Sequence, residues 1–349
     1  MRSPQSLNYY MPPEWHQHEC CWMQWPHEDP NRNSYLEVES WSHFDFEKGR
    51  HKWAEVAKAI SNFEKVKMIV HPMDIKIAKT ILHNSIEICE VKNDDCWARD
   101  SGATFLLNDQ RKLGGIDWEF NGWGKFNPHD SDNKIAKFMI EKSSAEYFKS
   151  SMVLEGGSIH VDGAGTLITT EQCLLNKNRN PNLSKIEIEE NLKKYLNIKK
   201  IIWLKHGTDE GTDGHVDNIA CFADENKVLA LACNDKQDPF YDKLNENLEI
   251  LKTEKDADGR RLEVIEIEMS YKRLIPDDDE PSSYINFYIA NGGIVMPSFD
   301  DEKADKKAQN IIKSVFPKRK ILALNGIDIS LGGGNIHCIT QQQPLSINK

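Results

Sequence analysis

Two segments far apart in this chain carry nearly the same glycine-rich pattern. Residues 154–161 read LEGGSIHV and residues 331–338 read LGGGNIHC, with Leu, Gly-Gly, Ile and His shared at five of eight places. A fainter echo, NGGIVM, occupies residues 291–296. Because glycine costs backbone entropy and adds no side chain to a core, these segments indicate a sharp turn or a close approach of a ligand to the backbone. The repeat predicts pseudo-symmetric units that each bring a glycine-lined strand start to one centre, with a chance match as the alternative.

Helical and strand patterns alternate along the chain. Ser184 and Glu187 have the spacing of a capping box at the start of one helix. Residues 215–232 and 283–297 look like hairpins, the second bending at Asn291 and Gly292. Four helix–strand pairs are expected at 51–63 with 65–70, 184–196 with 200–204, 240–251 with 262–268, and 305–316 with 320–325. This alternation predicts an α/β or α+β fold, and the lack of a Pro-, Gly- or Ser-rich linker predicts one domain over residues 1–349.

The charge balance limits the class of partner. The chain has 44 Lys and Arg against 55 Asp and Glu, a formal net charge of -11. This negative net charge disfavours nucleic acid and anionic membranes as partners, and it is compatible with the binding of a small cationic molecule. We expect no membrane span and no secretory signal, because no apolar run has the required length. The eight cysteines form no C-x-x-C pair, so we expect no disulfide framework and a location in the reducing cytoplasm.

Four clusters couple glycine to an acid, a histidine or a cysteine. They are CWARDSGATF at 96–105, LEGGSIHVDG at 154–163, TDGHVDNIACF at 212–222 and GGGNIHCITQQQP at 332–344. Residues two apart in a strand point the same way, so we expect His215 and Asp217 to form a paired base and acid on one face. His337 and Cys338 are adjacent and would point oppositely, so another histidine would have to activate Cys338 as a nucleophile.

Each of these residues also has a structural interpretation. Cys338 could be a small buried hydrophobe, and Asp100 could be half of a surface ion pair with Arg99. Trp97 and Trp123 could belong to the core or could form the walls of a cation pocket.

A second H-x-D pair could also act as a base and an acid, and the sequence lacks the common metal- and nucleotide-binding motifs. His160 and Asp162 repeat the H-x-D pattern, but Asp162 with Gly163 looks like a hairpin turn. We find no H-E-x-x-H, P-loop or G-x-G-x-x-G motif, and the histidines lack metal spacing. We therefore expect neither a metal nor another cofactor.

Six long motifs, in order, resemble a known family. They are YMPPEWHQHECCWMQWPH, VKNDDCWARDSGATF, VLEGGSIHVDGAGTLITTEQCLLNKNRNPNLS, TDGHVDN, SYINFYIANGGIVMPSF and LGGGNIHCITQQQP. Together they resemble the agmatine deiminases, within the bacterial-type peptidylarginine deiminase group of guanidine-modifying enzymes. The resemblance spans nearly the whole chain. It implies the pentein fold, a five-bladed α/β propeller with the active site at its centre, and it suggests a homo-oligomer.

The resemblance also implies roles for residues at matching positions. Cys338 would be the nucleophile and His215 the general acid and base, while Asp100 and Asp217 would clasp the guanidinium of agmatine. Thiolate attack would give a covalent thiouronium, which water would then hydrolyse. Three further groups would line the substrate site: Glu155 as another acid, Trp97 and Trp123 as walls, and the turn-forming Gly333 and Gly334 beside Cys338.

Recognition of the substrate tail is where the chain departs from the family pattern. Family members usually have an acidic residue four places before the histidine of GHVDN, and here that place is Gly211. Glu210, one step earlier, is our candidate for the ammonium end of agmatine. The segment PDDDEPSS at 276–283 is also shorter than the basic loop expected there. A peptidylarginine deiminase and an inactive pentein that only binds a guanidino ligand or a partner protein are the alternatives, although all four reactive positions are filled.

Overall fold

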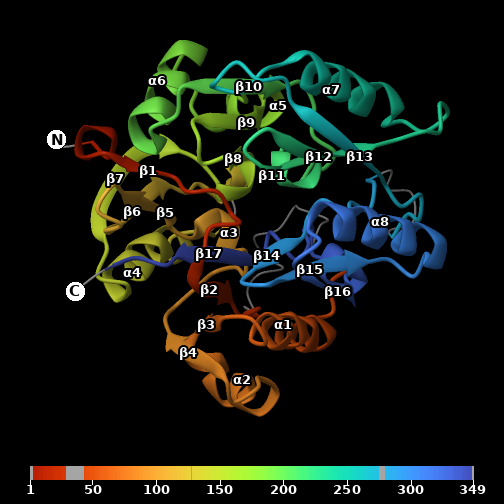
Figure 1. The fold of residues 1–349 in the computed structure, drawn as a ribbon. Coiled ribbons are helices and arrows are strands. Elements are labelled where there is room, and N and C mark those ends of the chain that lie inside the picture. Colours follow the sequence, from red (N-terminus) through yellow and green to blue (C-terminus); the bar gives the residue numbers. More distant parts are fainter. Residues whose placement is uncertain (1–2, 29–42, 127, 275–279, 348–349) are drawn as a thin grey trace.

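The computed structural model describes residues 3–28, 43–126, 128–274 and 280–347 (Figure 1). These residues form five small sheets. Four of the sheets contain an antiparallel pair of consecutive strands whose second member runs parallel to a third strand. In each of these four sheets one or more helices connect the second strand to the third. The α/β alternation expected from the sequence is therefore confirmed.

Apart from β1, the elements of these four sheets follow one another along the chain. The first sheet contains β1 (Tyr9–Tyr10), β5 (Thr104–Asn108), β6 (Leu113–Glu119) and β7 (Glu146–Val153), with η5 (Gly122–Phe126), η6 (Asp132–Lys134) and α4 (Ile135–Lys142) before β7. The second contains β8 (Ile159–Val161), β9 (Thr166–Thr170) and β10 (Lys200–Leu204), with α5 (Glu171–Leu174) and α6 (Lys185–Leu196). The third contains β11 (Ala220–Asp224), β12 (Lys227–Ala232) and β13 (Glu263–Glu268), with α7 (Tyr241–Thr253). The fourth contains β14 (Tyr288–Ala290), β15 (Gly293–Ser298) and β16 (Lys320–Asn325), with α8 (Glu302–Val315).

The fifth sheet joins the two ends of the chain. Its antiparallel pair consists of β17 (Thr340–Pro344) and β2 (His18–Gln24), followed in parallel by β3 (Lys65–Val70) and β4 (Ile86–Glu90). The helices of this part are α1 (Phe46–Ile60), η4 (Pro72–Asp74), α2 (Ile75–Ile81) and α9 (Ile327–Ser330), whereas η1 (Gln5–Leu7) lies against β1 and α6. Because β17 pairs with β2, the segment just before β17 is held against residues near the N-terminus.

Short turns before the first strands carry the residues of the glycine-rich clusters. They are α3 (Ala98–Ser101) before β5, η7 (Gly156–Ser158) before β8 and η8 (Val216–Asn218) before β11. In Figure 1 the longer helices α1, α4, α6, α7 and α8 lie around the outside, whereas α3 and the first strands β8, β11, β14 and β17 lie toward the middle. The number of sheets is the number that a pentein requires, and the five-bladed arrangement stays a prediction.

The local expectations are largely confirmed. Strands 65–70, 200–204 and 320–325 have the expected bounds. The hairpin bend falls between Ala290 and Gly293 as expected. Ser184 and Glu187 form both hydrogen bonds of the capping box at the start of α6.

Two expectations are wrong, and one lies partly outside the described residues. His215 and Asp217 do not lie on a strand, because residues 216–218 form a 3₁₀ turn and β11 begins only at Ala220. The echo NGGIVM does not begin at the centre, since Asn291 and Gly292 form the outer bend of their hairpin. Most of the segment PDDDEP, residues 276–279, lies outside the described part of the chain.

Apolar packing extends from the outer helix α1 to the middle of the molecule. One apolar cluster contains Trp53 from α1, Met68 from β3, and also Trp97, Trp123 and Cys338. Full burial of a large apolar side chain contributes about 1.5–3 kcal/mol, so this cluster fixes the backbone that carries Cys338.

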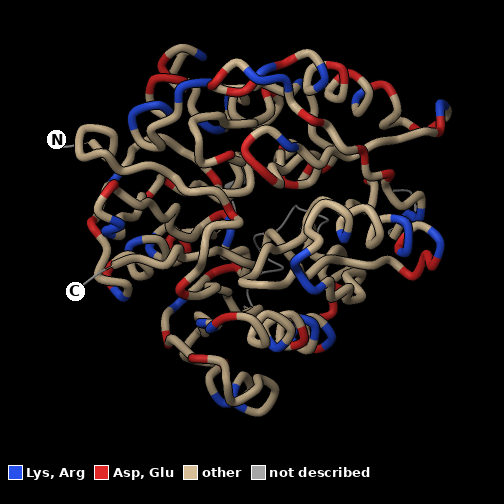
Figure 2. Tube along the Cα trace, viewed as in Figure 1, with Lys and Arg blue, Asp and Glu red and all other residues tan. Residues whose placement is uncertain are grey.

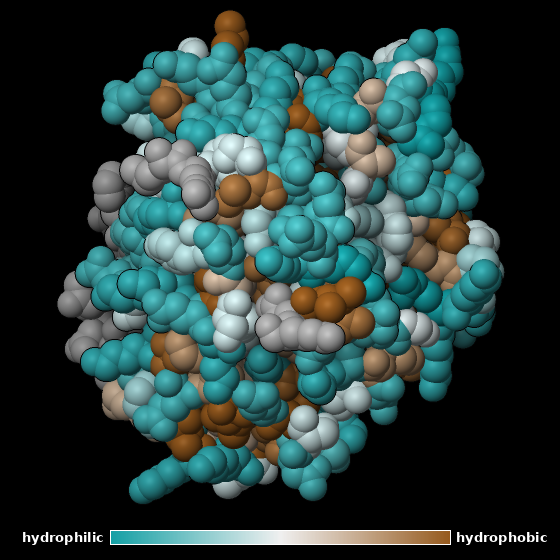
Figure 3. Space-filling view, turned by 60° about the vertical axis from the view of Figure 1, so that its left-hand side comes forward, coloured by the Kyte–Doolittle hydropathy of each residue, from teal (hydrophilic) through white to brown (hydrophobic). Residues whose placement is uncertain are grey.

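The surface is polar. Figure 2 shows acidic and basic residues interleaved along the outer helices α6, α7 and α8. The face drawn in Figure 3 is mostly hydrophilic, with hydrophobic residues in scattered groups, as is usual for a protein surface. In the described part of the chain, the helices are too short or too polar to cross a bilayer.

Candidate active site

Three short segments bring the four predicted catalytic side chains into the interior. Asp100 lies on α3, His215 and Asp217 lie at η8, and Cys338 lies two residues before β17. All four side chains are buried. Glu155, which immediately precedes η7, is fully buried as well. The glycine-rich clusters therefore do meet, as the repeat predicted.

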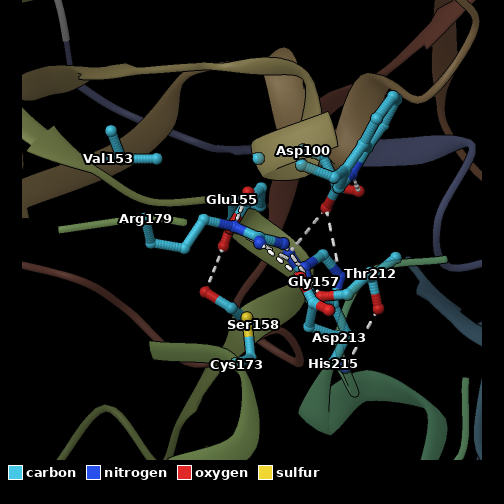
Figure 4. A network of polar contacts seen from close by, with 12 residues as sticks. Asp100, Val153, Glu155, Gly157, Ser158, Cys173, Arg179, Thr212, Asp213 and His215 are labelled. Carbon is cyan, nitrogen blue, oxygen red and sulfur yellow. Dashed lines mark hydrogen bonds and ion pairs between the residues drawn. The ribbon is translucent and has the colours of Figure 1, made fainter. Parts of the chain in front are cut away.

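Three of these side chains converge on Gly157. A Cβ atom placed on Gly157 would lie 2.6 Å from Nδ1 of His215, 2.9 Å from Oδ1 of Asp100 and 3.0 Å from Oδ2 of Asp217. The backbone N–H of Gly157 also donates a hydrogen bond of 3.0 Å to Asp100 Oδ1 (Figure 4). A side chain at this position would displace the reactive groups, so glycine is required here by close approach.

His215 lies between two carboxylates. Its Nδ1 atom is 3.7 Å from Asp100 Oδ1, and its Nε2 atom is 3.8 Å from Glu155 Oε2. Burial by itself would lower the pKa of His215. The charge of Asp100 and the contacts with Cys173 and Glu155 outweigh that effect and raise the pKa well above its ordinary value. His215 is therefore an imidazolium at neutral pH and can donate a proton.

Asp100 is anchored by an aromatic side chain. The indole Nε1 of Trp123 donates a hydrogen bond of 2.9 Å to Asp100 Oδ2. Burial raises the pKa of Asp100 to about 6, against the opposing influence of His215 and Trp123. Trp123 thus orients a carboxylate through its N–H group, a contact that the sequence-based interpretation as a pocket wall did not include.

Glu155 holds the loop that leads into η8. Arg179 Nε donates to Glu155 Oε1 at 2.6 Å, and Arg179 Nη1 donates to Asp213 Oδ2 at 2.6 Å (Figure 4). Burial opposes ionisation of Glu155, but Arg179 and His215 outweigh it and lower the pKa of the carboxyl. Glu155 is therefore ionised, and it is tied through Arg179 to the segment just before His215.

Cys338 is held by Asn286 and faces Asp217. Its Sγ atom lies 3.6 Å from Asp217 Oδ2 and accepts a hydrogen bond of 3.1 Å from Asn286 Nδ2. Burial, followed by the charges of Asp217 and Asp100, raises the pKa of the thiol well above its ordinary value. In this arrangement burial and the nearby carboxylates therefore favour the neutral thiol.

Two buried carboxylate oxygens in the site make no hydrogen bond. Within the described residues, Asp217 Oδ1 and Glu155 Oε2 lack a hydrogen-bond partner. Buried polar atoms are nearly always paired in native proteins, so unpaired acceptors require an explanation. A cation with N–H donors beside Cys338 would satisfy Asp217 Oδ1, whereas Glu155 Oε2 faces Nε2 of His215 at 3.8 Å.

Comparisons with known proteins agree with this geometry. The Porphyromonas-type peptidyl-arginine deiminase family model matches residues 10–344. The chain belongs to this family.

Several members of the group resemble the whole chain. A Legionella pneumophila relative is 46% identical and covers 99% of this chain and 97% of its own length. The agmatine deiminase of Pseudomonas aeruginosa is 41% identical, covering 98% of this chain and 97% of its own. A solved structure of the Enterococcus faecalis agmatine deiminase superposes with a TM-score of 0.91 at 35% identity, covering 99% of this chain and 98% of that one. The pentein expectation is confirmed at the level of fold class.

The two predicted glycines shape the backbone next to Cys338 of this deiminase-family chain. Gly333 has a φ of 98°, a conformation that L side chains rarely adopt. A Cβ atom on Gly334 would lie 2.6 Å from Cζ3 of Trp97 and 3.0 Å from Cβ of Cys338. Gly334 thus allows Trp97 and Cys338 to come together, which explains the run of glycines before the cysteine.

A small, partly open cavity of about 50 Å³ adjoins the cluster of Asp100, His215, Asp217 and Cys338. It reaches Gly334 and Asn218, which neighbour Trp97 and Asp217 respectively. Its described lining consists of Asn218, Leu274, Glu280, Pro281, Ser282, Ser283, Ser330, Gly334 and Asn335. Among these residues Glu280 alone carries a charge. Glu210, the predicted tail-binding acid, is an exposed residue, and its role stays a prediction.

Some functional candidates were missed by the sequence interpretation. Asn286 was assigned to a strand, yet its side chain contacts Cys338 and accepts the backbone N–H of His337 at 2.9 Å. Glu14 was not singled out, although it meets His337, His160 and Arg99 in the interior. Both residues lie within the six family-like motifs, but the spacing of residues in a motif does not reveal a contact between distant segments.

Histidines that lack metal spacing in the sequence do come together in space. Glu14, His160 and His337 form one such group, and Glu155, Cys173 and His215 form another. In both groups the acid is paired with an arginine, Arg99 or Arg179. The expectation that no metal is needed stays a prediction.

Proposed function

We propose that this protein is an agmatine deiminase, which hydrolyses agmatine to N-carbamoylputrescine and ammonia in a route to putrescine. The observation that carries the proposal is the convergence of Cys338, His215, Asp100 and Asp217 beside two unpaired buried carboxylate oxygens. We further propose that residues 1–349 act as one catalytic domain without a metal or other cofactor.

The guanidinium ion fits the chemistry of this cluster. It is planar, it remains charged at any physiological pH, and it presents N–H donors on every side. Carboxylates on Asp100, Asp217 and Glu155 would accept these hydrogen bonds and hold the ion in one orientation. The bound cation would also offset the negative charges that raise the pKa of Cys338, so substrate binding favours the thiolate.

The first half-reaction would break the bond to ammonia. Once the cation is bound, Cys338 loses its thiol proton to solvent, and the thiolate forms an S–C bond to the guanidinium carbon, which gives a neutral tetrahedral adduct. His215 then passes its proton to the departing nitrogen, the C–N bond breaks, and ammonia leaves. The product on the enzyme is a covalent thiouronium that retains the positive charge between the carboxylates.

The second half-reaction would restore the enzyme. Neutral His215 takes a proton from water, and the resulting hydroxide adds to the thiouronium carbon. The C–S bond breaks, Cys338 leaves as the thiolate, and the protonated ureido product gives its surplus proton to solvent. His215 therefore acts as acid in one half-reaction and as base in the other.

The cavity beside the cluster favours agmatine over arginine. Agmatine carries an ammonium at its far end, whereas free arginine would need a cation for its carboxylate. The single charged group in the described lining is the acid Glu280. We therefore assign the ammonium end to this cavity, with Glu280 as its counter-charge in place of the acid missing at position 211.

Ammonia release from agmatine, arginine and an arginyl peptide tests the proposal. We expect ammonia from agmatine at a kcat/KM at least a hundredfold above the other two. Preference for the peptide would make the protein a peptidylarginine deiminase, and no ammonia from any of the three would make it a binding module. All eight cysteines are free, and we propose a cytoplasmic enzyme that forms a homo-oligomer.

A further inference from the structure

Behind the catalytic cluster, three buried side chains form a chain of hydrogen bonds. His337 Nδ1 lies 2.8 Å from Asp217 Oδ2, and His337 Nε2 lies 2.8 Å from Glu14 Oε1. The three residues are between 2% and 4% exposed. Asp217 Oδ1, the other oxygen of the same carboxylate, is one of the unpaired acceptors of the site. His337 thus holds the same oxygen, Oδ2, that lies 3.6 Å from Cys338 Sγ, and it leaves Oδ1 available as an acceptor.

The geometry determines the charge of His337. An ionised carboxylate only accepts hydrogen bonds, so an imidazole placed between two of them must carry a proton on both nitrogens. Burial and Arg99 both oppose that charge, yet Glu14 and Asp217 outweigh them and raise the pKa of His337. Asp217 gains in return, because His337 helps to lower its pKa against the effect of burial.

Glu14 is itself fixed by charged neighbours. Its Oε1 accepts from Arg99 Nη1 at 3.2 Å, and its Oε2 lies 3.5 Å from His160 Nε2. Its backbone carbonyl accepts a hydrogen bond of 2.8 Å from His18 Nε2. His160 and His337 are the two histidines of the internal repeat, and their rings lie 6.2 Å apart on the same acid. The charged and titratable groups facing His337 are therefore Glu14, Asp217, Arg99 and His160.

We propose that Glu14 and His337 are positioning residues: Glu14 keeps both ring nitrogens of His337 protonated, and that ring holds the Asp217 carboxylate so that Oδ1 is left to accept from the substrate cation. The proposal rests on the proposed function in one respect, that Asp217 contacts the guanidinium. Neither Glu14 nor His337 touches the reacting atoms. Their effect passes through the carboxylate of Asp217, so their loss should act on cation binding before it acts on folding.

The protonation of His337 can be measured without any enzymatic activity. Nitrogen-15 NMR of labelled protein should show both ring nitrogens of His337 protonated at pH 7.5, with assignment by comparison with His337→Gln. In Glu14→Gln the ring should lose one proton at that pH, because one of its two counter-charges is gone. A neutral His337 in the unaltered protein would overturn the proposal, even if the enzyme proves inactive toward agmatine.

A double-mutant cycle measures whether the effect passes through Asp217. In a Cys338→Ala background, agmatine affinity is measured by calorimetry for Glu14→Gln, for Asp217→Asn and for the two together. We expect Glu14→Gln alone to weaken binding at least tenfold, and to weaken it less than threefold once Asp217 is Asn. Equal losses in both backgrounds, or less than a twofold loss from Glu14→Gln alone, would overturn the proposal.

Two further variants separate positioning from general loss of a buried charge. Asp117→Asn removes a carboxylate of similar burial on β6, where it pairs with Lys149 and Tyr147. This control should leave agmatine affinity within twofold. If Glu14→Gln fails to fold, His337→Gln is measured in its place, with the same expected losses in both backgrounds.

In the active enzyme, Glu14→Gln should raise KM by at least tenfold while kcat changes less than threefold. A fall in kcat without a rise in KM would contradict the proposal.

Discussion

His215 Nδ1 lies 3.7 Å from Asp100 Oδ1, and each side chain alters the protonation of the other. Asp100 raises the pKa of His215, while the imidazolium keeps the pKa of buried Asp100 from rising further. At neutral pH the site therefore holds an ionised acid for the substrate cation and a protonated histidine for the leaving group. This pairing makes the reaction sensitive to pH on the acid side.

The first prediction concerns that acid limb. Because the pKa of Asp100 is about 6, the carboxylate is ionised above this pH and becomes protonated as the pH falls through it. Protonation removes one of the charges that hold the substrate, so kcat/KM should fall about tenfold for each pH unit below 6. A pH profile of kcat/KM for agmatine measures this limb.

Asp100→Asn provides the matched control for the acid limb. Its side chain cannot become a carboxylate, so its kcat/KM should be lower by orders of magnitude near neutral pH. The step near pH 6 should also disappear from its profile. A variant that retains the same limb would show that another group causes it, and unchanged single-turnover kinetics would exclude Asp100 from the chemistry.

The second prediction concerns the nucleophile. Cys338→Ala should abolish ammonia release, because it removes the sulfur that lies 3.6 Å from Asp217 Oδ2 and leaves no nucleophile at that position. The substitution removes one atom from a buried position, so Tm should change by only a few degrees. Mass spectrometry of enzyme quenched during turnover should find an adduct on Cys338. Half the normal rate in the alanine variant would refute the assignment.

The third prediction tests the close approach at Gly157. Gly157→Ala would place a methyl group 2.6 Å from His215 Nδ1 and 2.9 Å from Asp100 Oδ1. We expect at least a hundredfold loss of kcat/KM, with a folded protein by circular dichroism. Gly211→Ala is the control, since a Cβ atom there would have no neighbour within 4 Å. A fully active Gly157→Ala enzyme would show that the three side chains tolerate displacement.

The sequence contained the fold and the reactive residue types, and it lacked the contacts between them. The spacing of apolar residues and the capping residues predicted the helices and the outer strands, because apolar burial and backbone hydrogen bonding determine these elements locally. His215 and Asp217 were assigned to a strand because H-x-D alternation looks the same in a strand and in a 3₁₀ turn. Glu14 and Asn286 could not be placed, since the folding of distant segments alone brings them to His337 and Cys338.

The fourth prediction decides which acid receives the ammonium end of agmatine. Glu280 lines the cavity next to the catalytic cluster, whereas Glu210 is exposed on the loop before His215. A partly buried ion pair is worth more than an exposed one, which is screened by water and salt. Glu280→Gln should therefore raise KM for agmatine about tenfold and leave kcat within threefold. It should also narrow the preference for agmatine over arginine, because the repulsion of the arginine carboxylate is removed. Glu210→Gln is the competing variant, and a larger rise in KM there than in Glu280→Gln would return the role to Glu210.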